Sequence, residues 1–160
     1  MTARDWLALC LTTETNQPHE MPAVAAVILN RLRGKGWPKE MVRVVRQAKQ
    51  FSAFNATGAL GDDEAFAIVR KAQPDALYSA ALACADDMMA RPEHQWPITT
   101  RAFWYFSPVS MQPAGAIPPW ALSYVALAVS GIDPYRFVFL FDGGMSHPLR
   151  GNAGAVFGRK

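Results

Sequence analysis

Cysteine is scarce in this 160-residue chain, and the apolar segments are too short to cross a membrane. The two cysteines, Cys10 and Cys84, both fall in apolar helical patterns, where a thiol behaves as a small hydrophobic group. The chain therefore has no disulfide framework. The apolar segment 23–29 (AVAAVIL) falls well short of the ~20 residues that span a bilayer, so we expect no stable membrane insertion.

Metal-ligand patterns are also missing, although acids and a histidine occur together over residues 86–94. Asp86, Asp87, Glu93 and His94 lack a recognised ligand spacing, and Pro92 separates the first pair from the second. We interpret these residues as a solvated helix end and expect no metal and no cofactor.

Strong charge of one sign is absent as well, since the formal net charge is only +3. No arginine-rich segment indicates nucleic-acid binding, and mild basicity fits an anionic polymer as well as many other partners. Half of the residues are hydrophobic, which excludes global disorder. We expect one domain over residues 1–160, acting as a monomer, with a loosely ordered Gly-rich tail from 142 that places His147 at the surface.

The first residues, MTARDWLALCLTTE, do not have the order of a secretion signal. Thr12, Thr13 and Glu14 interrupt the apolar segment, and no small-residue cleavage site follows it. Thr2 and Asp5 instead have the spacing of a helix N-cap. We expect synthesis in the cytoplasm, so that any action outside the cell requires another agent of delivery.

The most informative stretch is 6–33, which predicts two helices joined by a short polar loop. Leu7, Cys10 and Leu11 form a one-sided apolar stripe in the first helix, and Glu14 lies on the same face if the helix reaches it. A carboxyl group there would be partly desolvated, which favours the protonated form and suits a general acid. The alternative is that the helix ends before Glu14, which is then an ordinary loop residue.

The rest of the chain predicts helices followed by strands. Segment 23–29 is apolar all round and predicts a buried helix that ends near Gly34. A short helix opening at Pro38, a Gly/Asp linker at 55–63, and helices at 64–72 and 74–90 follow. An aromatic strand at 102–106, a Pro/Gly-rich loop at 110–119, and strands at 124–129 and 135–141 that form a hairpin complete the pattern.

Several of these segments together resemble the cell-wall hydrolase family that includes the spore-cortex-lytic enzymes. The resemblance rests on Glu14, PHE at 18–20, AVAAVILNRL at 23–32 and QFSAF at 50–54. AFWYFSP at 102–108, Pro119-Trp120 and YRF at 135–137 resemble the family's later aromatic, Pro/Trp and final strand signals. The order and spacing of these pieces, over roughly residues 6–141, carry the resemblance.

The resemblance implies an α+β, lysozyme-like fold: a mainly helical body with a small antiparallel β element in the C-terminal half. It implies cleavage of the peptidoglycan glycan strand between N-acetylmuramic acid and N-acetylglucosamine. If the protein is a lytic transglycosylase, Glu14 would act first as acid and then as base, and a 1,6-anhydro ring would close on the muramic acid. The absence of a secretion signal would fit a phage endolysin that is released by a holin or carried on a virion.

The resemblance also implies residues around the substrate. The expected substrate-binding residues are Gln50, Phe51, Ser52, Tyr105, Phe106, Trp120 and Glu20. Glu20 is in addition the nearest second carboxylate for the alternative of a lysozyme-type hydrolase.

Two departures from the family pattern keep other readings open. Thr15-Asn16-Gln17 replaces the family's Ala-Arg-Gly-Glu, in a connection about two residues shorter, and Ser107 replaces an Asn. A non-catalytic glycan-binding or phage structural protein is therefore a further alternative. No metal or nucleophile constellation supports an amidase.

Overall fold

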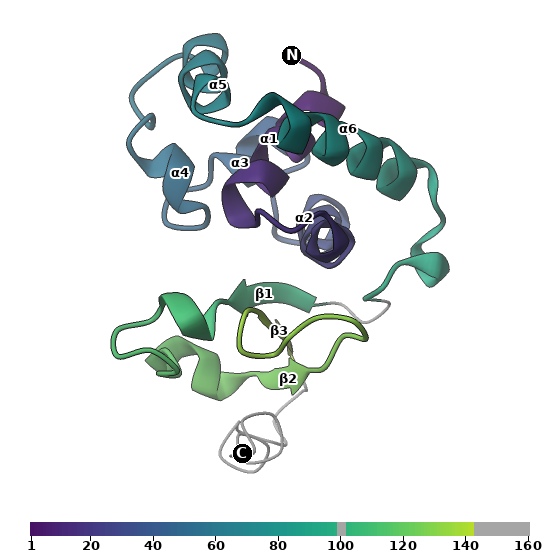
Figure 1. The fold of residues 1–160 in the computed structure, drawn as a ribbon, viewed down its shortest axis with the longest axis vertical. Helices are drawn as coiled ribbons and strands as arrows, with labels where there is room; N and C mark the ends of the chain where they lie inside the picture. The colour runs from purple at the N-terminus through teal and green to yellow at the C-terminus, as the bar shows by residue number, and fades with distance from the viewer. Residues whose placement is uncertain (99–101, 143–160) are drawn as a thin grey trace. The chain divides into compact units, whose positions relative to one another are not determined.

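The computed structural model describes residues 1–98 and 102–142. The chain forms two compact units, Met1–Trp96 and a second unit that begins at Pro97 (Figure 1). The first unit is helical, and the second contains the strands. The predicted α+β class, with an antiparallel element in the C-terminal half, is confirmed.

The first unit contains the five helices that the sequence predicts, with shifted bounds, and one short helix at 52–55 that it does not predict. They are α1 (Ala3–Glu14), α2 (Met21–Arg33), α3 (Met41–Val45), α4 (Ser52–Asn55), α5 (Asp62–Lys71) and α6 (Asp75–Ala90). Pro38 does not open α3, because the backbone is still extended at Glu40. The linker predicted at 55–63 is shorter, because Asp62 and Asp63 belong to the first turn of α5, where the helix dipole favours acids.

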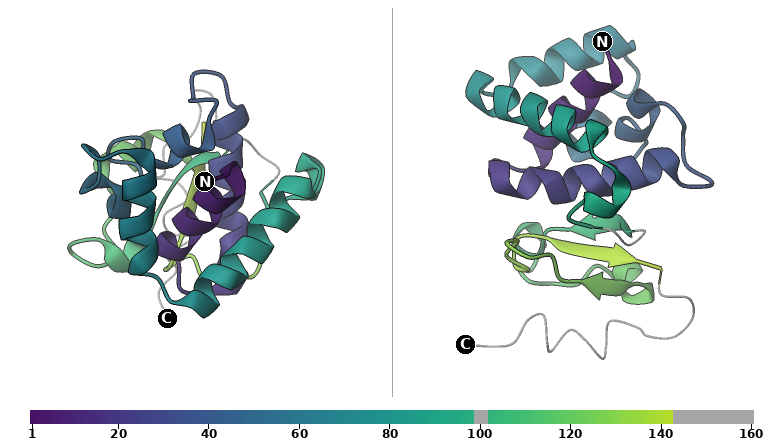
Figure 2. Two further views of the ribbon diagram at one scale, coloured as in Figure 1. Left: turned by 90° about the horizontal axis from the view of Figure 1, so that it is seen from above. Right: turned by 90° about the vertical axis from the view of Figure 1, so that its right-hand side faces the viewer.

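Helix α1 lies at the centre of the first core. Residues 6–12 are all buried, so the expected one-sided stripe is wrong and the helix is buried all round. The reason is tertiary: α2, α3, α5 and α6 all pack against α1, and Figure 2 shows α5 and α6 flanking it. The predicted N-cap is confirmed as a capping box, in which Thr2 Oγ1 accepts from the Asp5 N–H at 3.2 Å and the Thr2 N–H donates to Asp5 Oδ2 at 2.8 Å.

The second unit contains a three-stranded antiparallel sheet in the order β1-β3-β2. Its strands are β1 (Ala102–Phe106), β2 (Val125–Leu127) and β3 (Val138–Phe141). The hairpin of β2 and β3 is confirmed, although both strands are shorter than predicted. A register shift between Ala102 and Trp104 leaves Phe103 as the bulge residue of β1.

One face of this sheet has its own small core. Phe106, Ala121, Val138 and Leu140 are buried together there, and Ala121 comes from a 3-10 helix at Pro119–Ser123. The predictions of a loosely ordered tail and of a surface position for His147 concern residues outside the described part of the chain. In the described part of the chain, every helix is too short or too polar to span a bilayer.

Candidate active site

Glu14 is the last residue of α1, and its side chain is half-buried. The helix therefore reaches Glu14, and the alternative in which it ends earlier is wrong. Thr15 then takes an extended backbone, and its N–H donates to Leu11 O at 3.1 Å, which closes the last turn. No basic side chain occupies that turn. The carboxylate thus lies at the carbonyl end of a buried helix.

The thiol of Cys10 shows which charges surround this end of the helix. Burial, and then the charge of Glu14, raise the pKa of the Cys10 thiol well above its usual value, whereas the charge of Arg31 lowers it. A carboxylate from α1 and a guanidinium from α2 therefore act on the same buried sulfur. Cys10 itself is a free, fully buried thiol, as its apolar pattern predicts.

Arg31 brings the two central sequence motifs together. Its side chain is only 3% exposed, and Cζ lies 4.8 Å from the ring centroid of Trp37 and 5.2 Å from that of Phe51. Arg31 belongs to the LNR segment and Phe51 to QFS, so a buried cation–π contact joins segments twenty residues apart. Phe51 is 1% exposed, which makes it a support for Arg31 rather than an open surface for substrate.

The two polar residues of QFS are more accessible than the phenylalanine between them. Ser52 is exposed and opens α4, whereas Gln50 is half-buried and its N–H donates to Gln47 O at 3.1 Å. Lys49, just before them, has a φ of 64°, and its N–H donates to Asn55 Oδ1 at 3.1 Å. A left-handed conformation is unfavourable for lysine, so the fold must hold this turn in place.

The loop after Glu14 is closed by a hydrogen bond that the sequence analysis missed. Thr15 and Glu20 are 4% and 1% exposed, and Thr15 Oγ1 donates to Glu20 Oε2. The same hydroxyl oxygen accepts from the Gln17 N–H at 3.0 Å. Glu20 ends a 3-10 turn and precedes α2, where the helix dipole favours its negative charge. The contact ties the end of α1 to the start of α2.

The remaining predicted residues belong to the second unit. Tyr105 is half-buried, and its ring packs against Phe137 and Phe139 at centroid distances of 5.7 and 5.8 Å. Phe106 is 6% exposed and belongs to the core of its unit. Trp120 is 47% exposed, with its ring edge-on to Phe106 at 6.3 Å, and thus presents an aromatic surface to solvent.

Residues 16–131 match a family model described as Cell Wall Hydrolase. The chain belongs to the cell wall hydrolase family. The predicted family is confirmed, and the family's substrate is peptidoglycan. No curated protein and no solved structure matches the chain. The matched residues include Arg31, Phe51 and Trp120, and they begin two positions after Glu14.

The three acids of the 86–94 segment in this cell wall hydrolase have arginine partners. Asp86 accepts from Arg4 at 2.7 Å, Asp87 pairs with Arg91, and Glu93 accepts from Arg33 at 2.7 Å. His94 is exposed beside them. Within residues 1–98 and 102–142, no three His, Cys, Asp or Glu side chains lie where they could hold one metal ion.

Proposed function

We propose that this cell wall hydrolase cuts the glycan strand of peptidoglycan between N-acetylmuramic acid and N-acetylglucosamine, as a lytic transglycosylase with Glu14 as its acid and base. Glu14 first protonates the bridging glycosidic oxygen, and the bond from that oxygen to muramic C1 breaks. The resulting carboxylate then accepts the proton of the muramic C6 hydroxyl as O6 bonds to C1. A 1,6-anhydro ring closes, and Glu14 ends the cycle protonated.

The position of Glu14 supports both halves of this cycle. Partial burial and the carbonyl end of α1 disfavour a negative charge, which suits a group that starts as an acid. Arg31 acts on the same thiol as Glu14, and a positive charge on that side would favour the carboxylate that forms in the first step. One carboxyl group can thus serve in both protonation states.

The burial of Glu20 is the observation that carries the choice of a transglycosylase. A hydrolase of the lysozyme type requires a second carboxylate at the substrate, as base or nucleophile. Glu20 is the nearest candidate in the chain, yet it is 1% exposed and accepts a hydrogen bond from Thr15. It would have to leave a buried contact to reach a sugar. The proposed reaction needs no second carboxylate.

Binding of the glycan is assigned to accessible polar and aromatic groups. Gln50 and Ser52 are proposed to hydrogen-bond sugar hydroxyl or acetamido groups, and Trp120 and Tyr105 to pack against sugar faces. Phe51 and Phe106 are buried, so we assign them a supporting role: Phe51 lies between Gln50 and Ser52 in the chain, and Phe106 packs against Trp120. Delivery to the wall by a phage holin or from a virion stays a prediction.

Digestion of purified peptidoglycan, with products identified by mass spectrometry, tests the proposal. Wild type, Glu14→Gln and Glu20→Gln are compared with Glu64→Gln, a control at an exposed glutamate of α5. We expect anhydro-muramic products from wild type and from Glu64→Gln, and none from Glu14→Gln, because the amide cannot donate the required proton.

The other outcomes identify the alternatives. Reducing-end products that require both Glu14 and Glu20 would establish a lysozyme-type hydrolase. Retained binding to the wall without any products would favour a non-catalytic glycan-binding protein. Equal activity of wild type and Glu14→Gln would remove Glu14 from the mechanism.

A further inference from the structure

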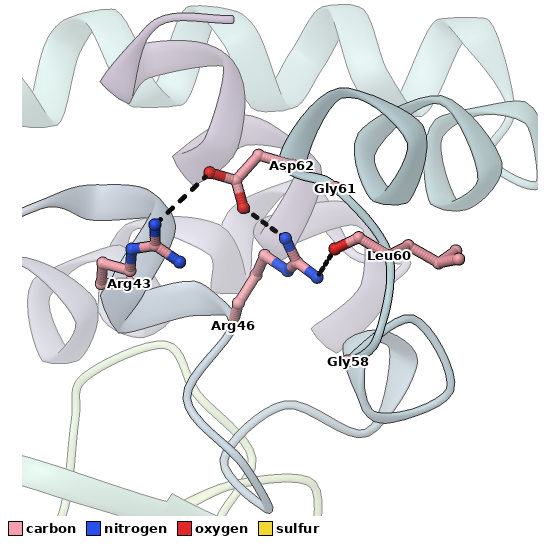
Figure 3. A pocket seen from close by; sticks show the side chains of 6 residues that line it. All are labelled: Arg43, Arg46, Gly58, Leu60, Gly61 and Asp62. Atoms are coloured by element: carbon pink, nitrogen blue, oxygen red, sulfur yellow. Dashed lines mark hydrogen bonds and ion pairs between the residues drawn. The ribbon is translucent and has the colours of Figure 1, made fainter.

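The first unit has a pocket on its surface that the proposed cleavage reaction does not use. Its volume is about 350 Å³, and it lies between α3 and the segment that leads into α5 (Figure 3). It is lined by Arg43, Arg46, Gly58, Leu60, Gly61 and Asp62. Along the chain, these residues flank the segment that carries Gln50 and Ser52.

Arg46 forms a structural wall of this pocket. Its side chain is only 9% exposed, and Nη2 donates to the carbonyl oxygens of Thr57 and Leu60, both at 2.8 Å. Nη1 pairs with Asp62 Oδ1. These bonds hold the 57–62 segment against α3, so the donors of Arg46 are committed to the fold.

Arg43 has a different setting. Its side chain is 62% exposed, and its ion pairs with Glu40 and Asp62 have N–O distances of 4.0 and 3.9 Å. Both distances exceed the length of a direct hydrogen bond. The guanidinium of Arg43 thus keeps hydrogen-bonding capacity for a ligand, and Oδ2 of Asp62 faces it across the opening (Figure 3).

The charges of the residues that line the pocket indicate which kind of ligand it can bind. Opposite charges on facing walls suit a group that carries both signs, with the carboxylate at Arg43 and the cation at Asp62. A purely anionic ligand would be disfavoured by Asp62 in the lining, and Asp63 and Glu64 follow it in the first turn of α5. A sugar ring would find no stacking platform, because none of the six lining residues is aromatic.

We propose that this pocket binds the α-amino-carboxylate zwitterion of a peptidoglycan stem peptide, of the kind that diaminopimelate carries at its free end. The Arg43 guanidinium binds the carboxylate, and Asp62 Oδ2 accepts from the ammonium group. A stem with lysine at this position offers the ammonium alone. The inference rests on peptidoglycan as the substrate of the proposed function but not on its cleavage mechanism.

Calorimetric titration with meso-diaminopimelate tests the pocket directly. Two analogues isolate the charges: pimelate lacks both amino groups, and 1,5-diaminopentane lacks both carboxylates. We expect each analogue to bind at least about tenfold more weakly than diaminopimelate, and Arg43→Gln to weaken diaminopimelate by a similar factor. Arg91→Gln, at a surface arginine paired with Asp87, is the matched control and should bind as wild type does.

Three results of the titration would overturn the proposal. They are binding of diaminopimelate that does not depend on Arg43, equal binding of pimelate, and Arg43-dependent binding of N-acetylglucosamine. The last would make the pocket a saccharide subsite.

A cleavage assay separates this inference from the proposed function. We compare glycan that carries diaminopimelate stems with strands from which an amidase has removed them. The ratio of kcat/KM on the two substrates should fall about tenfold in Arg43→Gln, mainly through KM, and stay at the wild-type value in Arg91→Gln. An unchanged ratio in Arg43→Gln would overturn the inference. Failure of the proposed function would instead appear as undiminished cleavage by Glu14→Gln, or as no cleavage by wild type, and the titration would still decide the pocket.

Discussion

The guanidinium of Arg31 lies over the ring of Phe51, with 5.2 Å between Cζ and the ring centroid. Trp37 provides a second ring for the same cation at 4.8 Å. Through this contact the buried helix α2 holds the turn that presents Gln50 and Ser52, while the charges of Arg31 and Glu14 both act on the Cys10 thiol. The accessible polar groups of QFS thus depend on a contact that is itself hidden from solvent.

Replacing Arg31 by lysine should destabilise the first unit by about 1–3 kcal/mol, because an ammonium group keeps the charge but loses the planar stacking on the rings. Urea unfolding measures the change. Arg33→Lys is the matched control, since Arg33 lies 4.6 Å from the Trp96 ring centroid but is 44% exposed, and it should cost about 0.5 kcal/mol. Equal losses at the two positions would show that burial of the Arg31 contact has no special weight.

Thr15→Val should lower the free energy of unfolding by about 1.5–3 kcal/mol, because the nearly isosteric change removes a hydrogen bond to the buried carboxylate of Glu20. Thr13→Val is the matched control for the loss of a threonine hydroxyl. Thr13 Oγ1 donates to Cys10 O at 2.8 Å within the helix, and its loss should change stability by about 0.5 kcal/mol. Thermal unfolding of both variants gives the result, and a larger loss at Thr13 would contradict the assigned role of Thr15.

The two arginines of the pocket should differ in their effect on stability. Arg46→Gln should cost about 2 kcal/mol, since it leaves two carbonyl groups and Asp62 without their donor. Arg43→Gln should cost less than about 0.5 kcal/mol, because its ion pairs are long and exposed. Urea unfolding of both variants decides this. A large loss in Arg43→Gln would make Arg43 a structural residue.

Alkylation of Cys84 should be slow at neutral pH and accelerate steeply in alkali. Burial, and then the charge of Asp87, raise the pKa of the Cys84 thiol to about 11, while Arg91 lowers it. Only the thiolate reacts, so the rate with iodoacetamide should rise about tenfold per pH unit between 8 and 10. Asp87→Asn removes a charge that raises this pKa and should increase the rate at pH 8.

Two comparisons complete that experiment. Asp86→Asn is the control, because Asp86 pairs with Arg4 and does not act on Cys84. Cys10 is fully buried and should react only when the protein unfolds. Rapid labelling of Cys10 in the native protein would show that α1 is more accessible than its packing implies.

Local pattern was sufficient for the longer helices, but it left open whether the first of them reaches Glu14, which the structure shows. Apolar periodicity, the Thr2–Asp5 spacing and the aromatic run at 102–106 depend on neighbours a few residues apart, which the sequence displays directly. The burial of α1 on all sides did not follow from the same pattern. It depends on α5 and α6, which begin at Asp62 and Asp75 and are therefore distant from α1 along the chain.

The family, the α+β class and Glu14 as the candidate acid followed from the order and spacing of the sequence motifs. The folded chain was needed to show that Thr15 holds Glu20, that Phe51 supports Arg31, and that Arg46 rather than Arg43 anchors the 57–62 segment. The residue type limits which hydrogen bonds and ion pairs a side chain can make. Which bond forms depends on the partners that loop closure brings within reach, and on the desolvation of those partners, and both are properties of the folded chain.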